Sequence, residues 1–456
     1  MPDMRKLLVA NRGEIACRIM RSARALGWKT VAVCSDADAS ALHTQMADEA
    51  INIGESPASK SYLRMDKLLD AAMKTGASAV HPGYGFLSES AQFASAVIEA
   101  GLLWVGPSPK TIRLMGDKQS AREAAMRAGV PVVPGSRRFL SGELDGLEAA
   151  GSEVAFPLLI KASAGGGGIG MRKVDRAEQL SGQAVMVQEA AQNSFGDGAI
   201  YLERHVSPAR HVEVQVFGFG NGSAIHLFER DCSLQRRFQK VIEETPAPGL
   251  PTETLTVMYD AALKLCAETD YAGAGTVEFI VDAETMQFYF LEMNTRIQVE
   301  HPVTEMVTGL DLVAMQLQLA ELGGKMPAVA PQSTGAAMEC RLYAENPAKR
   351  FFPSPGRLDV FRLPANIDHV RVDTAYREGD EVTPFYDPMI AKIVAHGADR
   401  AAAISRMVYA LESLQVEGIV TNRDFLLACL RHGEFQAGNV YTRFIDDLHG
   451  DLVRTS

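Results

Sequence analysis

The segment from Gly275 to Pro302, GTVEFIVDAETMQFYFLEMNTRIQVEHP, contains acidic side chains whose spacing could place two carboxylates side by side. Two runs of alternating apolar and polar residues are separated by a short loop, which predicts an antiparallel hairpin. If Ile280 pairs with Phe290, Glu278 lies directly opposite Glu292, with Cβ atoms about 4.5–5.5 Å apart. Two ionised carboxylates at this distance repel each other unless a proton or a cation lies between them.

The neighbouring polar residues extend this pattern toward metal and anion binding. Asn294 has the same parity as Glu292 and adds a neutral oxygen. Hard oxygen ligands on a sheet suit Mg²⁺ or Mn²⁺, and Mg²⁺ in such sites usually also holds phosphates. Arg296, Gln298 and Glu300 follow at every second position and predict an anion clamp with a possible base. The pattern alone also allows an exposed hairpin with solvated acids.

A glycine-rich turn after an apolar strand, AFPLLIKASAGGGGIGMRKV, is a candidate phosphate site. Glycines let backbone N–H groups face an anion without a Cβ in the way, and Lys161 adds a point charge beside them. Gly165, Gly167 and Gly170 match GxGxxG, but no helix is expected to open at Gly170, and the GxxxxGK[ST] pattern is absent. The flanking strands instead predict a hairpin flap that closes over phosphates.

Other charged residues are ambiguous when taken singly. Arg236, Arg237 and Lys240 form either an anion site or a solvated loop. Arg341 falls in the middle of a predicted strand beside Glu339, and a buried arginine there is costly unless an anion pairs with it.

Two further stretches do not indicate a binding site by themselves. The run His81–Gly85, HPGYG, follows a predicted strand, where open α/β sheets bind ligands, although a tight turn explains it equally well. Lys118 lies in a polar turn before a helix, and His211 and Glu213 lie in an alternating strand.

The elements that must position these residues fall into several domains, because 456 residues are too many for one compact core. Residues 5–35 predict strand, helix and strand, the opening of a doubly wound parallel sheet without the glycine turn of a dinucleotide site. One helix is expected over 304–323, followed by a Pro/Gly-rich boundary. Short strands over 335–446 predict an antiparallel, β-rich domain closed by helices.

Composition limits the functional classes. A net charge of −11 argues against non-specific nucleic-acid binding. The six cysteines are scattered and lack CxxC spacing, so neither zinc nor a disulfide framework is expected, and a reducing cytoplasm fits. The apolar run after Arg5 and Lys6 is too short for a signal peptide, and no run approaches a membrane span.

Several blocks in order resemble the biotin carboxylase subunit or domain of biotin-dependent carboxylases, within the ATP-grasp superfamily. They are ANRGEIACRI, HPGYGFLSE, IRLMGDK, IKASAGGGG, ERDCSLQRR, EMNTRIQVEHPVTE, ECRLYAE and FYDPMIAK, and they span nearly the whole chain. The resemblance implies a mixed α/β and α+β fold with three domains. These are a doubly wound N-terminal domain (1–116), an ATP-grasp domain (117–330) with a mobile glycine-rich lid (about 132–206), and an antiparallel β-rich C-terminal domain (331–447).

The resemblance also implies the role of each site residue. Residues implied to bind the nucleotide are Lys118, Lys161, Gly165, Gly166, Gly167, Gly168, Glu203, Arg204, Val206, His211, Gln235 and Ile280. Glu278, Glu292 and Asn294 would hold Mg²⁺ or Mn²⁺, and Lys240, Arg296, Gln298 and Val299 would bind bicarbonate. Glu300 would be the base, Arg341 would stabilise the biotin ureido oxygen, and Tyr84 would lie beside the biotin ring.

The implied reaction is ATP- and bicarbonate-dependent carboxylation of biotin at N1′ through carboxyphosphate, the first half-reaction of enzymes such as the acetyl-CoA carboxylase of fatty acid biosynthesis. The sequence holds no Ala-Met-Lys-Met biotinylation site and no carboxyltransferase portion. We therefore expect a separate biotin carboxyl carrier protein and a carboxyltransferase subunit. The resemblance also implies a homodimer, and the cysteine pattern fits a cytoplasmic location. The acyl acceptor stays open between acetyl-CoA, another acyl-CoA, pyruvate and urea.

Two departures from the family pattern keep alternatives open. Phe238 stands where a polar His or Asn usually follows the arginine pair, and Ile169 stands where the glycine flap usually carries Lys or Arg. The alternatives are a weakly active or non-catalytic paralogue and another ATP-grasp ligase that joins a carboxylate to an amine.

Overall fold

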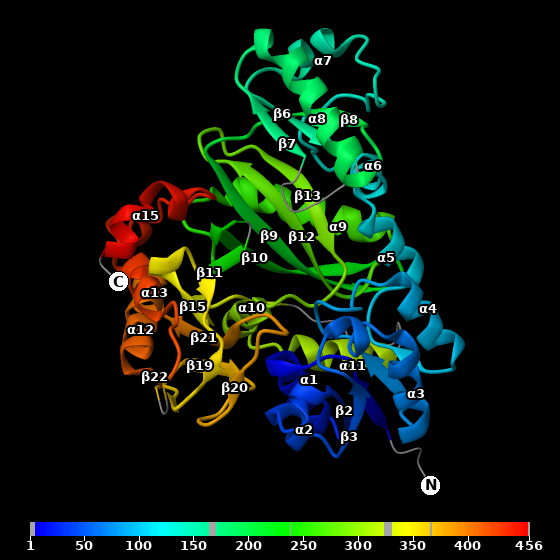
Figure 1. Cartoon of the computed structure of the whole chain (residues 1–456), viewed down its shortest axis with the longest axis vertical. Helices are drawn as coiled ribbons and strands as arrows, with labels where there is room; N and C mark the ends of the chain where they lie inside the picture. The colour runs from blue at the N-terminus through cyan, green and yellow to red at the C-terminus, as the bar shows by residue number, and fades with distance from the viewer. Residues whose placement is uncertain (1–4, 164–169, 238, 323–330, 365–366, 455–456) are drawn as a thin grey trace.

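The first part of the chain is a parallel sheet covered on both faces. The computed structural model describes residues 5–163, 170–237, 239–322, 331–364 and 367–454. The strand order is β3-β2-β1-β4-β5, with helix α1 against one face and α3 and α4 against the other (Figure 1). The bounds are β1 Lys6–Val9, α1 Gly13–Ala25, β2 Lys29–Ser35, α2 Leu42–Met46, β3 Glu49–Gly54, α3 Met65–Thr75, β4 Ala79–His81, α4 Ala91–Glu99 and β5 Leu103–Trp104. The predicted doubly wound sheet is confirmed.

A small subdomain stands apart at the top of Figure 1 and contains most of the described residues of the range predicted to form the lid. Its antiparallel sheet has the order β7-β6-β8, and β6 pairs with β7 as the predicted hairpin flap. Helices α5 and α6 lead into it from the first domain. The bounds are α5 Pro109–Gly116, α6 Lys118–Arg127, α7 Leu147–Val154, β6 Leu158–Ala162, β7 Met171–Val174, α8 Leu180–Phe195 and β8 Ile200–Arg204.

The centre of the molecule is a long antiparallel sheet of order β13-β12-β9-β10-β11-β14-β21-β19. Helix α9 covers one face of its first half, where Val212, Val214, Val277 and Phe279 are buried. The bounds are β9 Ala209–Phe219, β10 Ala224–Arg236, β11 Gln239–Thr245, α9 Thr252–Glu268, β12 Ala272–Asp282 and β13 Phe288–Asn294. Strict alternation sends the polar residues between these valines to the other face. The functional side chains therefore share one face of the sheet.

The predicted single helix over 304–323 is wrong. The chain forms α10 (His301–Thr308) and α11 (Leu312–Leu322), because Gly309 adopts φ +70° and ends α10 in a left-handed cap. Helix α10 packs on the polar face of the long sheet, against β10, β11, β14 and β21. The break lets α11 turn back to pack on α1 of the first domain.

The C-terminal part is antiparallel and helix-covered, as predicted, but its main strands extend the central sheet. Strand β14 pairs with β11 of the central part, and β21 and β19 continue from it. The main bounds are β14 Ala336–Tyr343, β19 Val370–Thr374, β21 Met389–Gly397, α12 Arg400–Ser413, α13 Arg423–Arg431, α14 Gly433–Gln436 and α15 Phe444–Arg454. The short strands are β15 Glu345–Asn346, β16 Phe352–Pro353, β17 Gly356–Arg357, β18 Val360–Arg362, β20 Glu381–Val382 and β22 Gln415–Glu417. One sheet therefore carries residues from both parts into a single site.

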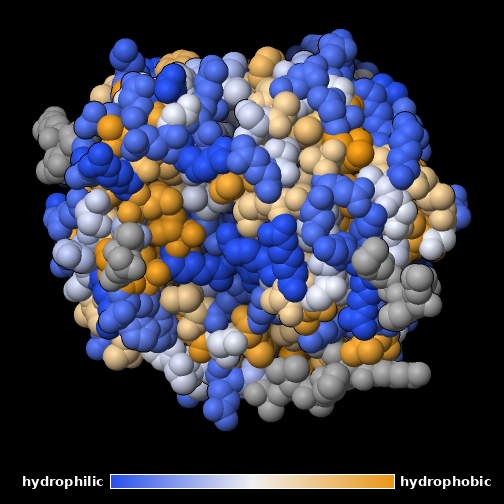
Figure 2. Space-filling view, turned by 90° about the horizontal axis from the view of Figure 1, so that it is seen from below, coloured by the Kyte–Doolittle hydropathy of each residue, from blue (hydrophilic) through white to orange (hydrophobic). Residues whose placement is uncertain are grey.

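The surface beneath the first and last parts is mixed in character. Figure 2 shows a hydrophilic hollow in the middle of this face with an apolar patch beside it. None of the helices in the described ranges combines the length and apolar composition needed to cross a membrane.

Candidate active site

A row of charged residues crosses four strands at one level of the sheet. Glu292 on β13 pairs with Glu278 on β12, which pairs with Glu213 on β9, which pairs with Arg230 on β10. The predicted opposition of Glu278 and Glu292 is confirmed.

The register from which that opposition was predicted is wrong. Ile280 pairs with Tyr289, and Phe290 pairs with Phe279. An irregularity between Glu278 and Phe279 inserts Leu291 as an extra residue and restores the opposition of the two acids.

Lys240 is the cation at the centre of the site. Its Nζ donates to Glu213 Oε2 at 2.6 Å, Glu278 Oε1 at 2.9 Å and Glu300 Oε1 at 2.6 Å. Burial opposes the charged form, but the surrounding carboxylates outweigh it and raise the pKa of Lys240 well above its usual value. Lys240 therefore stays charged, as its predicted contact with an anion requires. The solvated-loop interpretation of this lysine is wrong.

Glu300 lies between two cations. Its Oε1 accepts from Lys240, and its Oε2 accepts from Arg341 Nη2 at 3.0 Å. Arg341 also donates through Nε to Glu243 Oε1 at 2.6 Å, which supplies the anion expected for a buried mid-strand arginine. Burial by itself would raise the pKa of Glu300, but Lys240 and Arg341 lower it below its usual range. The side chain is an ionised carboxylate with two competing cation partners.

The residues after β13 form a second, more open edge of the site. Arg296 donates to Asn294 Oδ1 at 2.9 Å and to Glu89 Oε2 at 3.1 Å. Gln298 Nε2 donates to Glu278 Oε1 at 2.9 Å. Gln298 therefore contacts one of the acids that Lys240 contacts, and Arg296 contacts the neighbouring Asn294. The fold brings these side chains together as expected.

The acidic pair and Asn294 fit a divalent cation on chemical grounds. Glu278 and Glu292 present carboxylates from paired strands, and Asn294 Nδ2 lies 2.9 Å from Glu278 Oε1. Burial opposes ionisation of Glu278, yet Lys240 and His211 hold its pKa well below the usual value. Desolvation and the charge of Glu278 raise the pKa of Glu292, although Glu292 is exposed to solvent. The oxygen set suits Mg²⁺ or Mn²⁺.

The residues implied to bind nucleotide lie at the junction of the lid and the long sheet. Lys161 on β6 forms an ion pair with Glu203 on β8. His211 Nε2 lies 2.8 Å from Glu278 Oε2, and Ile280 is its partner across the sheet. Arg204 Nε donates to Val154 O at 3.3 Å.

The other implied nucleotide residues lie on several elements. Lys118 opens α6, Gln235 pairs with Lys240, and Val206 follows β8. The predicted residues Gly165, Gly166, Gly167 and Gly168, with the departures Ile169 and Phe238, lie outside the described residues. Their roles stay predictions.

Tyr84 is linked to the site through a buried lysine that the sequence analysis missed. Its hydroxyl donates to Glu14 at the start of α1. Lys392 on β21 lies 3.1 Å from Glu14 Oε1 and donates to Val299 O at 2.8 Å. One cation therefore joins the HPGYG turn to the backbone beside Glu300.

Arg230, which the sequence analysis also missed, is the structural centre of the charged row. It is 0% exposed and donates to Glu213, Gln215 and Thr304 at 2.6–2.8 Å. The available signal was its position in a strand whose neighbour, β9, shows strict polar alternation. Arg230 holds Glu213, and Glu213 in turn orients Lys240.

Replacing Arg230 by methionine is expected to lower the free energy of unfolding by about 3–5 kcal/mol, because Glu213 would keep a buried charge without its main partner. Thermal and denaturant unfolding measure the loss. The matched control is Arg127→Met, which removes a surface pair with Glu268 and is expected to cost no more than about 1 kcal/mol. Equal losses in the two variants would show that Arg230 carries no special role.

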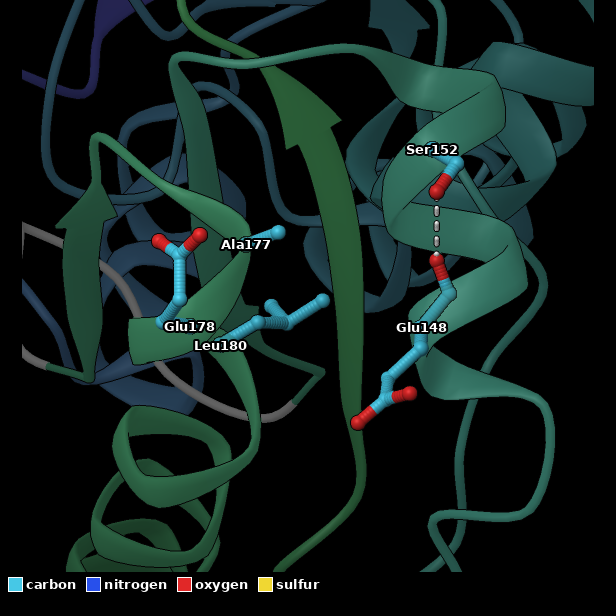
Figure 3. Close-up of a pocket in the computed structure, with 5 residues that line it drawn as sticks. All are labelled: Glu148, Ser152, Ala177, Glu178 and Leu180. Atoms are coloured by element: carbon cyan, nitrogen blue, oxygen red, sulfur yellow. Dashed lines mark hydrogen bonds between the residues drawn. The ribbon is translucent and has the colours of Figure 1, made fainter.

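A pocket in the lid subdomain lies away from this chemistry. Figure 3 shows it between α7 and the turn before α8, lined by Glu148, Ser152, Ala177, Glu178 and Leu180. Its two charged side chains are both acidic, and Ser152 already donates to Glu148 O at 3.0 Å. The lining has no cation for an anionic substrate.

Comparison with protein families assigns three consecutive models to the chain. "Biotin carboxylase, N-terminal domain" matches residues 3–112, "Carbamoyl-phosphate synthase L chain, ATP binding domain" matches 117–328, and "Biotin carboxylase C-terminal domain" matches 339–447.

Curated proteins of two kinds are similar to the chain. Biotin carboxylase 1 of Bacillus subtilis is 47% identical over 446 residues, covering 97% of this chain and 98% of that protein. The mitochondrial methylcrotonoyl-CoA carboxylase subunit alpha of rice (Oryza sativa subsp. japonica) is 48% identical over 453 residues. The match covers 99% of this chain but 61% of the rice protein, so the chain spans about three fifths of the length of such relatives.

Solved structures agree with these matches. The biotin carboxylase domain dimer of Hydrogenobacter thermophilus 2-oxoglutarate carboxylase, in complex with MgADP, ADP and bicarbonate, superposes with a TM-score of 0.90 at 40% identity. The alignment covers 98% of each chain. The biotin carboxylase of Campylobacter jejuni in a β-γ-ATP complex gives the same TM-score and identity and covers 98% of this chain and 99% of that one.

Proposed function

The chain belongs to the biotin carboxylase family, and from this premise we propose that it carboxylates N1′ of biotin with ATP and bicarbonate. The observation that carries the proposal is Glu300, a buried carboxylate held between Lys240 and Arg341 at the edge of a carboxylate pair. Bicarbonate-dependent ADP release that is stimulated by free biotin tests it. Release that depends on an amine instead would favour a carboxylate–amine ligase, and no release from folded protein would favour a non-catalytic paralogue.

The proposed reaction proceeds in balanced steps. A bicarbonate oxygen attacks the γ-phosphorus of ATP, the bond to ADP breaks, and Glu300 takes the bicarbonate proton. The resulting carboxyphosphate breaks into CO₂ and phosphate. Phosphate takes the N1′ proton of biotin, and N1′ forms the new bond to CO₂. The site must exclude water because both intermediates, carboxyphosphate and CO₂, are short-lived in water.

The geometry explains how a weakly basic carboxylate can act as the base. Without an anion beside it, Glu300 is bonded to both Lys240 and Arg341, which keeps its basicity low. Bicarbonate bound against Lys240 and Arg296 would share the positive charge. The pKa of Glu300 would then rise toward the range in which general bases work.

Arg341 is proposed to change partners during the second stage. The oxygen of biotin gains negative charge as N1′ loses its proton, and a guanidinium stabilises such a charge best when it is already oriented. Glu243 orients Arg341 from the neighbouring strand. Tyr84, fixed by Glu14, is proposed to lie beside the biotin ring.

Glu278, Glu292 and Asn294 are the residues that would hold Mg²⁺ or Mn²⁺. When bound, the ion would offset charge on the phosphate oxygens during transfer. The protein's own part is to keep Glu278 ionised, which Lys240 and His211 do, and to fix the carboxylates by strand pairing.

Lys161, which lies on β6 within the proposed lid of about 132–206, is proposed to bind ATP phosphates together with Lys118. Replacing Lys161 by methionine is expected to raise KM for ATP by about 10–100-fold, the effect of losing a charged contact worth about 1.5–3 kcal/mol. Steady-state ADP release measures this. Lys173→Met is the matched control, because Lys173 lies in the same small sheet but pairs with Asp175 at the surface. A KM within twofold of the wild type for Lys161→Met would refute the assignment.

The remaining assignments are proposals about the whole assembly. We propose a cytoplasmic homodimer that receives biotin on a carrier protein and works with a carboxyltransferase subunit. The domain boundaries 1–116, 117–330 and 331–447 are proposed with it, and the family matches fall within or close to these limits. The acyl acceptor belongs to the carboxyltransferase.

A further inference from the structure

A second pair of buried glutamates lies one strand away from Glu300, and the reaction proposed above does not use it. Glu243 on β11 pairs directly with Glu339 on β14, and both side chains are 0% exposed. Directly opposed residues have Cβ atoms about 4.5–5.5 Å apart, close enough for their carboxyl groups to meet. Glu243 and Glu339 would therefore repel each other if both were ionised, as Glu278 and Glu292 would. They are also more deeply buried than that pair.

Only one of the four carboxyl oxygens of this pair, Glu243 Oε1, has a hydrogen-bond donor among the described residues. Arg341 donates through Nε to Glu243 Oε1 at 2.6 Å, and its Nη2 forms an ion pair with the same oxygen at 2.5 Å. Glu243 Oε2 and both oxygens of Glu339 are buried without a hydrogen-bond partner among the described residues. A buried, ionised carboxylate with no donor is strongly unfavourable. A proton between the two residues supplies the missing donor.

The charged groups that face Glu339 come from every surrounding element. Arg341 lies two residues along its own strand and is already bonded to Glu243 and Glu300. Lys392 lies opposite Arg341 on β21 and is bonded to Glu14 and to the backbone of Val299. Tyr84 from the HPGYG turn, which is bonded to Glu14, also faces Glu339. Helix α10 packs on β14 as well, and its His301 lies near Lys392.

We propose that Glu339 is a positioning residue: its carboxyl group carries a proton, donates it in a hydrogen bond to Glu243 Oε2, and so holds Glu243 as the anion that orients Arg341. Burial and the charge of Glu243 raise the pKa of Glu339 well above its usual value. Burial raises the pKa of Glu243 only to about 7, because Arg341 opposes it. Arg341 bonds Glu243 directly and no hydrogen-bond donor among the described residues reaches Glu339, so the shared proton is assigned to Glu339.

The proton has a consequence for the reaction, and this step rests on the proposed function. An ionised Glu339 would compete with Glu243 and Glu300 for Arg341, and would leave less positive charge for the biotin oxygen. The neutral acid gives Glu243 a second hydrogen bond without adding a negative charge. Loss of the proton at alkaline pH is expected to lower biotin-dependent turnover.

Infrared spectroscopy of the whole chain tests the proton directly. The wild type is expected to show the C=O band of a protonated carboxylic acid at pH 8, where exposed glutamates, with pKa values of about 4.3, are ionised. The band should shift on ¹³C-glutamate labelling and disappear in Glu339→Gln. It should persist in Glu229→Gln, a buried control whose carboxylate accepts from two neutral donors, Ala247 N and Tyr259. A spectrum unchanged by Glu339→Gln would overturn the proposal.

Kinetics supply the second readout. Glu339→Gln keeps a donor but cannot ionise, so the alkaline fall in biotin-dependent kcat/KM should move to higher pH. Glu339→Leu removes the donor and is expected to lower biotin-dependent kcat/KM by about tenfold, the value of one hydrogen bond of about 1.4 kcal/mol. If the alkaline fall in biotin-dependent kcat/KM occurs at the same pH in Glu339→Gln as in the wild type, Glu339 is not a positioning residue for Arg341. If the wild type releases no ADP with bicarbonate, the proposed function fails while the infrared result still decides the proton.

Discussion

Replacing Glu300 by glutamine is expected to reduce bicarbonate-dependent ADP release by about 10²–10⁴-fold, the range of a positioned general base. Glutamine keeps the shape and its single amide oxygen can still accept from one of the two cations, Lys240 or Arg341, but the amide cannot take a proton. The loss should appear in kcat with little change in KM for ATP, because Glu300 lies on the anion side of the site and not at the lid. The assay is ADP release with Mg²⁺ and bicarbonate, with and without free biotin.

The control for Glu300→Gln separates chemistry from folding. Glu244 lies on β11 and is bonded to Arg400, away from Lys240 and Arg341. Glu244→Gln therefore removes a buried carboxylate from the same sheet and is expected to retain bicarbonate-dependent turnover. Matching thermal stability of Glu300→Gln and Glu244→Gln would assign the lost rate to the base. If Glu300→Gln releases ADP as fast as the wild type, the proposed mechanism is refuted.

Replacing Arg341 by methionine is expected to separate the two stages of the reaction. Biotin stimulation should fall by about 10²–10³-fold, as for removal of an oriented donor to a developing anion. Bicarbonate-dependent ADP release without biotin should fall less, because Lys240 still contacts Glu300. Lysine at this position keeps the charge but cannot form the fork to Glu243 and Glu300, so Arg341→Lys is expected to be intermediate.

Arg400→Met is the matched control for Arg341→Met. Arg400 also makes a two-nitrogen contact with a buried glutamate of β11, Glu244, and it lies outside the site. Its loss should affect stability without affecting the ratio of rates with and without biotin. Arg341→Met would contradict the assigned role if both rates fell in equal proportion.

The sequence by itself determined the local structure and the chemistry of the main residues. Alternation in residues 276–294 predicted the hairpin and the opposition of Glu278 and Glu292, because a strand's period of two sends every second side chain to one face. The pairing of the two strands that flank the glycine-rich turn was predictable from the apolar runs on either side of it. The doubly wound opening was predictable from a helical stretch between two apolar runs. The blocks that resemble a known family then implied roles for residues far apart in the chain.

Only the tertiary structure decided which side chains share partners. The bulge at Leu291 cannot be read from alternation, since one inserted residue changes the register without changing the pattern. The single helix predicted over 304–323 failed at Gly309, where a left-handed cap, and not the apolar period, ends α10. Pairing of β11 with β14 joined Glu243 to Glu339 and Arg341 across about a hundred residues, and no local signal specifies such a partner. Charges in a buried network depend on every neighbouring strand, so the sequence names the ionisable groups, and the fold decides which of them hold a proton.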